Sequence, residues 1–245
     1  AFWRGTEVAV KKPVDPRSAH DPALKEDFRK EALILGEVRH PNVVLLMGVS
    51  LRAPNLCLLL EWCGGGSLHD ALHRSKQDLS KEQRLGLAAG VASAISFLHT
   101  SSPAIIHRDI KTQNVLLDDT RMVAKLCDFG LAIKLSDVGD TNPGAGTPRY
   151  MAPELFRGEA CSLGSDVFAF GVTLWEMYAR EQPFGGCELT EIKDKVCNGE
   201  RPGVPLTCPR HVGQLLKDCW GPAADARPHI LEVLKQLRSL KDSVI

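Results

Sequence analysis

The sequence predicts an α+β fold in two lobes, a small strand-rich lobe followed by a larger helical lobe. Three observations support this prediction. Short apolar runs of strand length dominate before Gly64-Gly65-Gly66, longer helix-like runs dominate after it, and these glycines mark the sharpest change in composition. Consecutive glycines suit a hinge or a close backbone approach. The expected boundary separates residues 1–62 from residues 63–245.

The composition is that of an ordinary globular protein. Of the 245 residues, 44% are apolar and 24% charged, and 30 Lys and Arg balance 30 Asp and Glu. A balanced charge gives no general attraction to nucleic acid, so no nucleic-acid partner is expected. No apolar run is long enough to span a membrane. The eight cysteines contain no C-x-x-C pair, which argues against a zinc site and indicates reduced thiols in a cytoplasmic protein.

The first lobe is expected to contain strands and one helix. Arg4-Gly5-Thr6 has the composition of a hairpin turn. Asp21-Pro22 is a typical helix start, with Pro in the first turn. The expected elements are strands near Trp3 and at Val8–Val10, a helix from Pro22 to about Val38, and strands within Val43–Val49 and Leu56–Trp62.

The second lobe is expected to be mainly helical. Ser80-Lys81-Glu82-Gln83 is a capping box that begins a long helix. Ser165-Asp166 is expected to cap a run, through Trp175, that is apolar all round and therefore belongs in the core. Residues 128–154 show little periodicity, which is typical of a functional loop. The other expected elements are strands at Val115–Leu117 and Val123–Cys127, helices at 188–198 and 209–220, and a final amphipathic helix from Ile230 to Leu240.

A cluster of polar residues lies between apolar, strand-like neighbours at His107–Asn114. It reads H-R-D-x-x-x-x-N, a pattern in which the Asp can act as base and the Asn as metal ligand. An isolated Asp and Asn in a loop would most often serve turn formation. The interpretation therefore depends on whether the rest of the chain supplies the other parts of a phosphoryl-transfer site.

Two other segments supply such parts. Lys11 follows the strand-like Val8-Ala9-Val10, and Glu31 lies on the first helix, where it could hold the lysine in place. Taken alone, each would be a solvated side chain. Asp128-Phe129-Gly130 follows an expected strand, and Asp128 and Asn114 offer the oxygen ligands that Mg²⁺ prefers.

Taken in order, these residues resemble the landmarks of a eukaryotic protein kinase catalytic domain. The resemblance covers nearly all of the chain and implies a bilobal kinase fold, ATP with Mg²⁺ (or Mn²⁺ in its place) as cofactors, and a protein substrate. The matching residues are Lys11, Glu31, His107-Arg108-Asp109, Asn114, Asp128-Phe129-Gly130, Ala152-Pro153-Glu154, Asp166 and Arg227.

The resemblance implies a role for each of these residues. Asp109 would orient the acceptor hydroxyl, Asn114 and Asp128 would hold the metal, and Lys11, held by Glu31, would bind the nucleotide phosphates. Ala9 and Leu116 would enclose adenine, Leu60 would guard the back of the pocket, and the Glu61 carbonyl and Cys63 amide would bond the adenine edge. Structural roles are implied for His107, Phe129 and Gly130, for Asp166 on the catalytic-loop backbone, for the ion pair of Glu154 with Arg227, and for an interlobe spine of Leu35, Leu46, His107 and Phe129.

The acceptor class follows from two residues. Lys111, two positions after Asp109, and Thr147 in Gly146-Thr147-Pro148 resemble the serine/threonine pattern, in which the lysine meets the γ-phosphate. The segment Trp3–Lys11 and the segment Glu61–Leu68 are similar to the tyrosine-kinase-like group, above all to Raf-like and mixed-lineage kinases. Several of these kinases act on other kinases, so the substrate could be another kinase, by analogy.

Regulation is suggested by Arg108. A cation beside the catalytic aspartate usually pairs with a phosphate on the activation loop. Ser136 and Thr141 are the candidates, with Thr141 preferred, and an unmodified loop hydroxyl has equal weight.

The resemblance is incomplete at the start of the chain. The glycine-rich phosphate loop would precede Trp3 and is absent, so we expect either a fragment of a longer chain or an incomplete gene model. By itself this segment is expected to bind ATP poorly and to fold less well. The alternative function is a pseudokinase that binds protein partners without transferring phosphate, although Lys11, Asp109, Asn114 and Asp128 are all present. A small-molecule kinase is a third alternative, against which the segment ending in Ala152-Pro153-Glu154 argues.

Overall fold

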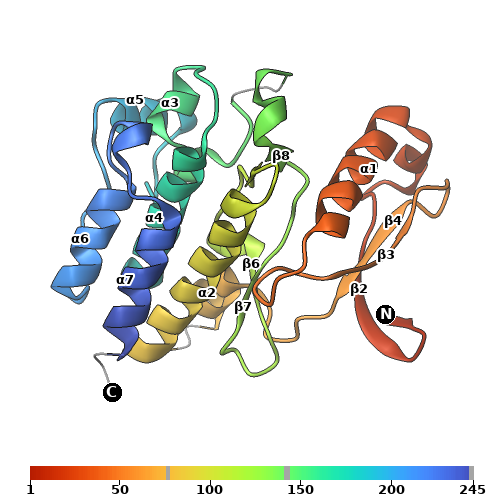
Figure 1. The fold of residues 1–245 in the computed structure, drawn as a ribbon, viewed down its shortest axis with the longest axis horizontal. Coiled ribbons are helices and arrows are strands. Elements are labelled where there is room, and N and C mark those ends of the chain that lie inside the picture. The colour runs from red at the N-terminus through yellow and green to blue at the C-terminus, as the bar shows by residue number, and fades with distance from the viewer. Residues whose placement is uncertain (76–77, 141–143, 243–245) are drawn as a thin grey trace.

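The computed structural model describes residues 1–75, 78–140 and 144–242, which form two lobes (Figure 1). The smaller lobe, on the right of Figure 1, contains a four-stranded sheet and helix α1. The larger lobe contains helices α2 to α7 and two two-stranded sheets. The predicted bilobal α+β fold is therefore confirmed.

The small lobe is built on an antiparallel sheet. Its strands lie in the order β1 (Phe2–Trp3), β2 (Thr6–Lys11), β4 (Cys57–Glu61) and β3 (Leu46–Ser50). Arg4 and Gly5 adopt positive φ angles of 49° and 81° and form the predicted hairpin turn. Helix α1 (Pro22–Glu37) begins where predicted, because the Asp21 carboxylate accepts a hydrogen bond of 2.9 Å from the Ala23 amide.

One strand is shorter than predicted. The apolar run Val43–Val49 was expected to be one strand, but β3 begins only at Leu46. Val43 instead forms an isolated bridge with Leu126, and the Val44 amide donates to the Leu126 carbonyl at 2.9 Å. These residues are apolar because they pack against the large lobe, and not because they extend the sheet.

The large lobe is organised around a buried helix. Helix α4 (Leu163–Ala179) is buried without interruption from Ser165 to Tyr178, as its apolar sequence predicted. It contacts α2 (Lys81–Thr100), which in turn contacts α7 (Ile230–Asp242). The predicted capping box of α2 is present, with Ser80 and Gln83 bonded at 2.9 and 3.1 Å. The other helices are α3 (Pro153–Phe156), α5 (Leu189–Cys197) and α6 (Arg210–Cys219).

The start of α4 corrects one prediction. Ser165-Asp166 was expected to cap this helix, but the helix begins at Leu163 and the cap residue is Ser162. The Ser162 amide donates to Ser165 Oγ at 3.1 Å. Asp166 lies inside the first turn and directs its carboxylate to the catalytic loop. The prediction that Ser165-Asp166 caps the helix is therefore wrong.

Short elements that the sequence did not predict lie around the active site. The aperiodic stretch 128–154 contains β8 (Ile133–Lys134), which pairs with β5 (Ile105–Ile106), and two 3₁₀ segments. The predicted strands after the catalytic loop are present as β6 (Val115–Leu117) and β7 (Ala124–Leu126). The remaining short helices are 3₁₀ turns at Pro16–His20, Thr112–Asn114, Leu135–Asp140, Pro148–Tyr150 and Ala224–Ala226 and a π-helical turn at Asp70–Arg74.

The glycine segment makes the close backbone approach that its sequence suggested. A Cβ atom on Gly65 would lie 2.3 Å from the Asp118 carbonyl oxygen, so no side chain fits there. The Gly64 amide donates to the Asp119 carboxylate at 2.8 Å. This segment is thus fixed against the loop between β6 and β7.

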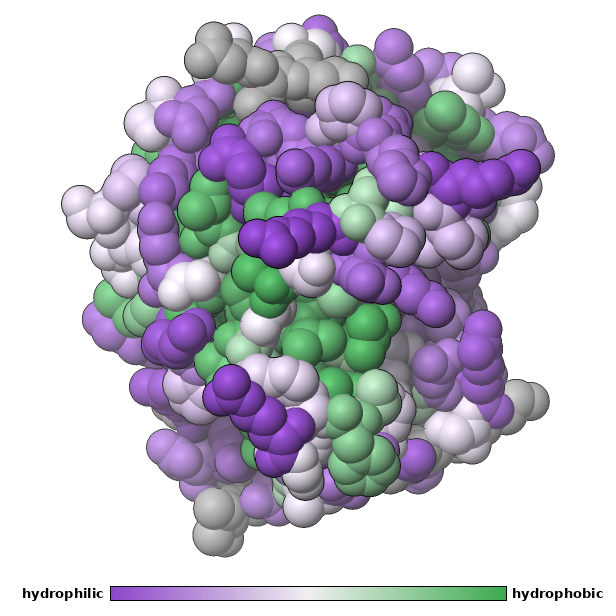
Figure 2. All heavy atoms as spheres, turned by 90° about the vertical axis from the view of Figure 1, so that its right-hand side faces the viewer, coloured by the Kyte–Doolittle hydropathy of each residue, from purple (hydrophilic) through white to green (hydrophobic). Residues whose placement is uncertain are grey.

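Figure 2 views the molecule from the side of the small lobe, and apolar side chains gather near the middle of this face with polar ones around them. The strands of the small lobe carry exposed apolar side chains, among them Phe2, Val10 and Val49. Beneath the sheet, Phe28 of α1 packs with Leu56 and Leu58 in a separate small core. Among the described residues, no helix combines the length and apolar composition needed to cross a membrane.

Candidate active site

A charged cluster joins three distant segments between the lobes. The Lys11 ammonium, at the end of β2, lies 2.8 Å from both carboxylate oxygens of Glu31 on α1. It also lies 2.7 Å from Asp128 Oδ1, which follows β7. The structure therefore brings together the three residues that the sequence suggested as a phosphate and metal site.

The electrostatics of the cluster favour the ionised forms of Lys11 and Asp128. Burial lowers the pKa of Lys11, but the charges of Glu31 and Asp128 outweigh burial, so this pKa lies above its ordinary value. Burial raises the pKa of Asp128, yet the hydrogen bond and charge of Lys11 hold it below its ordinary value. A cation and a carboxylate thus lie side by side and charged, as a site for nucleotide phosphate and metal requires.

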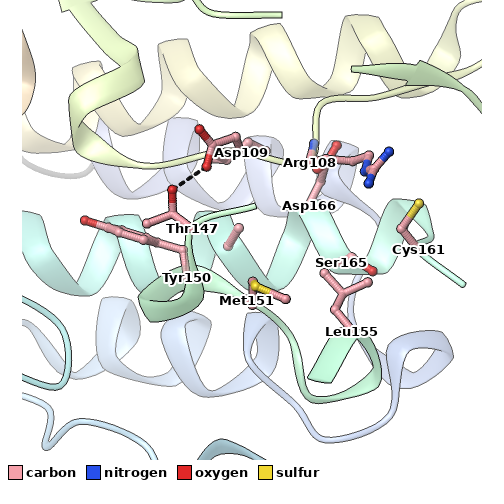
Figure 3. Close-up of a pocket in the computed structure, with 11 residues that line it drawn as sticks. Arg108, Asp109, Thr147, Tyr150, Met151, Leu155, Cys161, Ser165 and Asp166 are labelled. Carbon is pink, nitrogen blue, oxygen red and sulfur yellow. Dashed lines mark hydrogen bonds between the residues drawn. The ribbon is translucent and has the colours of Figure 1, made fainter. Parts of the chain in front are cut away.

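The catalytic loop forms a second cluster around Asp109. Thr147 Oγ1 donates to Asp109 Oδ1 at 2.6 Å, and the Lys111 ammonium donates to Asp109 Oδ2 at 2.6 Å. Lys111 also contacts Thr147 Oγ1 at 2.7 Å. The contact between Asp109 and Thr147 is drawn in Figure 3. These three residues, from two segments 36 positions apart, form one hydrogen-bonded group.

The orientation of Asn114 fits a metal ligand. Its Nδ2 donates to the backbone oxygen and to Oδ2 of Asp109, both at 2.8 Å. The side-chain oxygen Oδ1 is then the atom that Asn114 would offer to a metal, together with a carboxylate oxygen of Asp128. Amide and carboxylate oxygens are the donors that Mg²⁺ prefers, so the residues present fit a Mg²⁺ ion with nucleotide phosphates.

Asp166 holds the backbone of the catalytic loop. Its carboxylate accepts hydrogen bonds from the amides of His107 and Arg108, both at 2.9 Å, and contacts His99 Nε2 at 3.0 Å. Arg108 has a positive φ of 69°, a conformation that is unfavourable for a residue with a side chain. The hydrogen bonds from the His107 and Arg108 amides to the buried Asp166 carboxylate keep this strained residue in place. The contact with His99 was not foreseen from the sequence.

Two of the suggested interlobe residues are in direct contact. The rings of His107 and Phe129 meet edge to face with centroids 4.8 Å apart. Leu35 and Phe129 are buried in one continuous core, and Leu46 is packed against that core. Burial lowers the pKa of His107, so its ring is neutral and serves packing. Gly130 follows Phe129, and a Cβ atom added to it would lie 3.6 Å from Glu31 Oε2.

The residues suggested for adenine binding lie on paired strands of the small lobe, just after β4, and on β6 of the large lobe. Ala9 of β2 pairs with Leu60 of β4, and Leu116 of β6 bridges to Ser67 after the glycine segment. Burial raises the pKa of Cys63 to about 11, so its thiol is protonated. Glu61 has a side-chain role that the sequence did not indicate, because its Oε1 accepts from the Leu45 amide at 2.7 Å and from Lys125 at 3.1 Å.

The suggested regulatory residues are only partly placed. Arg108 lines a small pocket under the catalytic loop together with Thr147, Tyr150 and Cys161 (Figure 3). Ser136 lies on the exposed 3₁₀ segment, where its hydroxyl contacts Asp137 at 2.7 Å. Thr141 lies outside the described residues.

The end of the activation segment is anchored by an ion pair. Arg227 Nη1 and Nη2 lie 2.7 and 2.8 Å from the two carboxylate oxygens of Glu154. Both side chains are buried, and although burial raises the pKa of Glu154, its interactions with Arg227 and Ser165 help to hold it below its ordinary value. The structure thus brings these two residues together, and the contact is bidentate.

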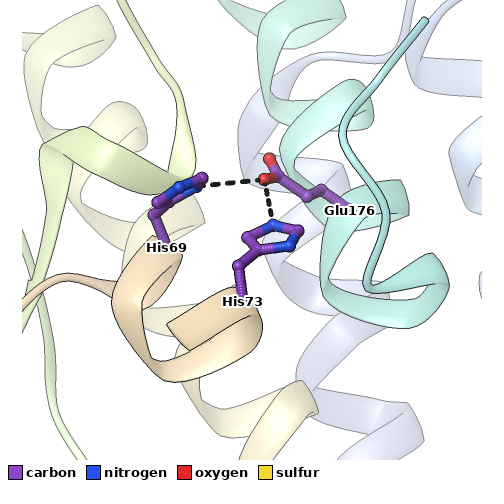
Figure 4. Close-up of side chains that lie close together, drawn as sticks. All are labelled: His69, His73 and Glu176. Carbon is purple, nitrogen blue, oxygen red and sulfur yellow. Dashed lines mark hydrogen bonds and ion pairs between the residues drawn. The ribbon is translucent and has the colours of Figure 1, made fainter. Parts of the chain in front are cut away.

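One group of clustered polar side chains was not predicted from the sequence. His69, His73 and Glu176 converge from the π-helical turn and from α4 (Figure 4). Two signals could have indicated them. The histidines are spaced i, i+4, which places them on one helical face, and Glu176 is a charged residue directly after the apolar run of α4.

Comparisons with known proteins agree with this site. A probable serine/threonine-protein kinase of Dictyostelium discoideum is 38% identical over 240 residues, which cover 98% of this chain and 26% of that protein. The probable serine/threonine-protein kinase SIS8 of Arabidopsis thaliana is 37% identical over 244 residues, covering 99% of this chain and 23% of SIS8. Serine/threonine-protein kinase CTR1 of the same plant is 36% identical over 249 residues, covering 100% of this chain and 30% of CTR1.

The chain thus spans between 23% and 30% of the length of these three relatives. The sequence pattern of the family described as "Protein tyrosine and serine/threonine kinase" matches residues 3–237. Nearly the whole chain is covered by this match and by each relative. The chain therefore belongs to the protein tyrosine and serine/threonine kinase family.

Proposed function

We propose that this domain transfers the γ-phosphoryl group of ATP to serine and threonine hydroxyls of protein substrates. The observation that carries the proposal is the position of Asp109, whose carboxylate accepts hydrogen bonds from both Thr147 Oγ1 and Lys111 Nζ. Phosphoryl transfer needs a carboxylate that accepts a hydrogen bond from the acceptor hydroxyl and a cation beside it for the transferring phosphate. Asp109 and Lys111 provide these two groups.

Each group in the site has a proposed task. Lys11, fixed by Glu31, binds the nucleotide phosphates, and Asn114 and Asp128 hold Mg²⁺, with Mn²⁺ as a substitute. When bound, the metal neutralises charge on the phosphate oxygens. Asp109 orients the acceptor hydroxyl, and Lys111 neutralises charge that develops on the transferred group. Ala9, Leu60, Leu116 and the backbone of Glu61 and Cys63 receive adenine.

The contacts of Thr147 support a preference for serine and threonine. Thr147 contacts both Asp109 and Lys111, which ties the activation segment to the catalytic loop. We further assign the domain to the tyrosine-kinase-like group, near Raf-like and mixed-lineage kinases, with another kinase as a candidate substrate. The boundary between the lobes is placed at residues 62 and 63, where the glycine segment begins. All eight cysteines are unpaired, which supports a cytoplasmic location.

The decisive experiment measures phosphoryl transfer with a matched substitution. The 245-residue protein is incubated with adenosine 5′-(γ-thio)triphosphate and a generic protein substrate, and thiophosphate on serine, threonine and tyrosine is quantified. We expect transfer to serine and threonine, and a loss of about 10²–10⁴-fold in Asp109→Asn, as expected for removal of a general base. The control is Asp225→Asn, which makes the same chemical change at an exposed position of the large lobe.

Two results would contradict the proposal. Equal transfer by wild type and Asp109→Asn would show that the activity comes from a contaminant. Binding of ATP with Mg²⁺, measured by calorimetry, without any transfer would instead indicate a pseudokinase.

We also propose that phosphorylation of Ser136 or Thr141 regulates the domain through Arg108. Ser136 is exposed and therefore accessible to another kinase. Phosphopeptide mapping of active protein is expected to find phosphate on one of the two. Full activity of a Ser136→Ala/Thr141→Ala variant would contradict this proposal.

A further inference from the structure

Three side chains outside the catalytic cluster form a group with metal-ligand chemistry. His69 Nδ1, His73 Nε2 and a Glu176 carboxylate oxygen lie within 4.8 Å of one another. Figure 4 shows the two imidazoles, one turn apart, directed toward the carboxylate from the facing helix. We propose that His69, His73 and Glu176 form a binding site for a transition-metal dication of the zinc class.

The distances fit such an ion. Glu176 Oε1 lies 2.8 Å from His73 Nε2 and 3.6 Å from His69 Nδ1. Tetrahedral zinc with bonds of about 2.0–2.1 Å separates neighbouring ligands by about 3.3 Å. The two contacts lie on either side of this value, and the third pair of atoms, His69 Nδ1 and His73 Nε2, lies within 4.8 Å. Rotation of the two imidazoles would bring all three atoms to one ion.

Glu176 has a charge that its surroundings leave open to a cation. Its side chain is fully buried at 0% exposure. Within the described parts of the chain, its ion-pair partners are His69 and His73, with no lysine or arginine among them. Its other contacts are hydroxyls, Thr112 Oγ1 at 3.0 Å and Tyr150 Oη at 2.6 Å. A buried carboxylate without a permanent positive partner is unfavourable, and a metal dication would supply that charge.

The orientation of His69 also suits a ligand. Its Nδ1 lies 3.1 Å from Nε2 of Gln113. An amide nitrogen can only donate, so Nδ1 of His69 is an acceptor and carries no proton. A metal-binding imidazole nitrogen must be unprotonated, so the ion would replace the Gln113 contact at His69 Nδ1 and the proton that His73 Nε2 donates to Glu176 Oε1 at 2.8 Å. Both histidines keep part of their side chains exposed, 24% and 19%, which leaves a path for the ion.

The ligand set selects the class of metal. Imidazole nitrogen suits Zn²⁺, Cu²⁺, Fe²⁺ and Ni²⁺, whereas Mg²⁺ prefers oxygen ligands alone. Two histidines and one carboxylate also form the protein ligands of known zinc sites with an open fourth position. This site is therefore distinct in chemistry from the one proposed at Asn114 and Asp128, and Mg²⁺ would not compete for it.

The place of the site in the fold gives it a consequence. Thr112 lies in the 3₁₀ turn of the catalytic loop, and Tyr150 lies in the activation segment just after Thr147. Both donate to Glu176, so a metal held there connects these segments to α4 and to the π-helical turn. We expect the bound ion to raise the thermal stability of the domain.

The test measures zinc binding directly. Metal-free protein, prepared with a chelator and without nucleotide, is titrated with ZnCl₂ by calorimetry in excess MgCl₂. We expect one tight site in the wild type. We also expect CoCl₂ to give the visible absorption of tetrahedral, nitrogen-ligated cobalt. His73→Gln keeps a hydrogen-bond donor toward Glu176 but removes the imidazole, and His69→Ala removes the other nitrogen. Each is expected to weaken zinc binding by at least about tenfold.

The controls are His20→Ala and His211→Ala, two exposed histidines in other parts of the fold. They are expected to bind zinc like the wild type, and circular dichroism checks the folding of every variant. The proposal is overturned if wild type binds no zinc in excess Mg²⁺, or if folded His73→Gln and His69→Ala bind it as tightly as the controls. Zinc binding is independent of phosphoryl transfer, so neither result depends on the proposed function.

Discussion

Two buried glutamates of the large lobe have opposite surroundings. Glu154 on α3 meets the guanidinium of Arg227 through two hydrogen bonds of 2.7 and 2.8 Å. Glu176 on α4 is even more deeply buried, but it meets two imidazoles and two hydroxyls. The first carboxylate has a partner whose charge is permanent, and the second does not.

The difference separates a structural contact from a candidate site. Arg227 also donates to the carbonyl oxygens of Gly164 and Gly221, both at 2.8 Å, so its charge is fully used within the protein. Nothing else needs to bind at Glu154. The partners of Glu176 are neutral groups or titratable imidazoles, so its charge is open to compensation by an ion. Two residues of the same type, in neighbouring helices, thus serve different purposes because of their neighbours.

Breaking the Glu154–Arg227 pair should produce the largest effect. Arg227→Met removes the charge at similar length and leaves Glu154 buried and unpaired. We expect the free energy of unfolding to fall by about 3–5 kcal/mol. Urea unfolding monitored by fluorescence measures it.

The matched control is Arg157→Met, at an arginine that pairs with Glu159 on the surface. Its loss is expected to stay below about 1 kcal/mol. The same urea midpoint for both variants would contradict the assignment of Arg227 as a buried anchor. A Glu154→Gln/Arg227→Met double variant is expected to recover part of the loss, because no charge is then left unpaired.

The sequence was informative where a residue type and its spacing indicate a single structure. Asp21 before Pro22 predicted the start of α1, and the apolar run after Ser165 predicted a core helix. The resemblance to kinases predicted that Lys11, Glu31 and Asp128 lie close together, although Asp128 comes 117 positions after Lys11 in the chain. The fold class could therefore be predicted almost completely.

The sequence was uninformative where long-range contacts decide. Val43 and Val44 look like part of a strand, and only the position of β7 shows that they pack elsewhere. Similarly, the sequence does not predict that His69 and Glu176 lie close together. His69 lies at a short turn, and Glu176 lies 107 positions later in a core helix. Their meeting depends on how α4 packs, which local patterns do not specify.

Removing the Tyr150 hydroxyl, which donates to Glu176, is expected to have an intermediate effect on stability. Burial, followed by the charge of Glu176, raises the pKa of Tyr150, so its hydroxyl remains protonated and donates to Glu176 Oε2. Tyr150→Phe should lower the free energy of unfolding by about 1.5–3 kcal/mol, the value of a hydrogen bond to a charged group. Urea unfolding measures it without added metal.

The chain offers a matched control in Tyr178. Its hydroxyl is buried and, in the part of the chain that the structure describes, has no hydrogen-bond partner. Tyr178→Phe is therefore expected to leave stability unchanged or to raise it slightly. If the two Tyr→Phe variants lose the same stability, the carboxylate of Glu176 does not depend on its donors as we describe.

Acid should reveal the difference between Glu154 and an ordinary carboxylate, with the smallest effect of the three. Burial raises the pKa of Glu154, but its hydrogen bonds and the charge of Arg227 together hold it below its ordinary value of 4.5. In the unfolded chain this carboxylate therefore binds a proton at higher pH than in the folded protein. Its contribution to stability is complete above about pH 4.5 and is lost as the pH falls through the lower folded value.

Urea midpoints measured at neutral pH and at several values below pH 4.5 test this expectation. Each titrating carboxylate contributes at most about 1.4 kcal/mol per pH unit. Glu154→Gln should therefore show a shallower decline in acid, whereas the exposed Glu159→Gln should retain the wild-type slope. Asp166 leaves a residual slope in both variants, because burial raises its pKa but the interactions with His99 and His107 together hold it below its ordinary value. An unchanged slope in Glu154→Gln would mean that the pair with Arg227 does not set the acid response, and that Glu154 and Glu176 differ less than their neighbours suggest.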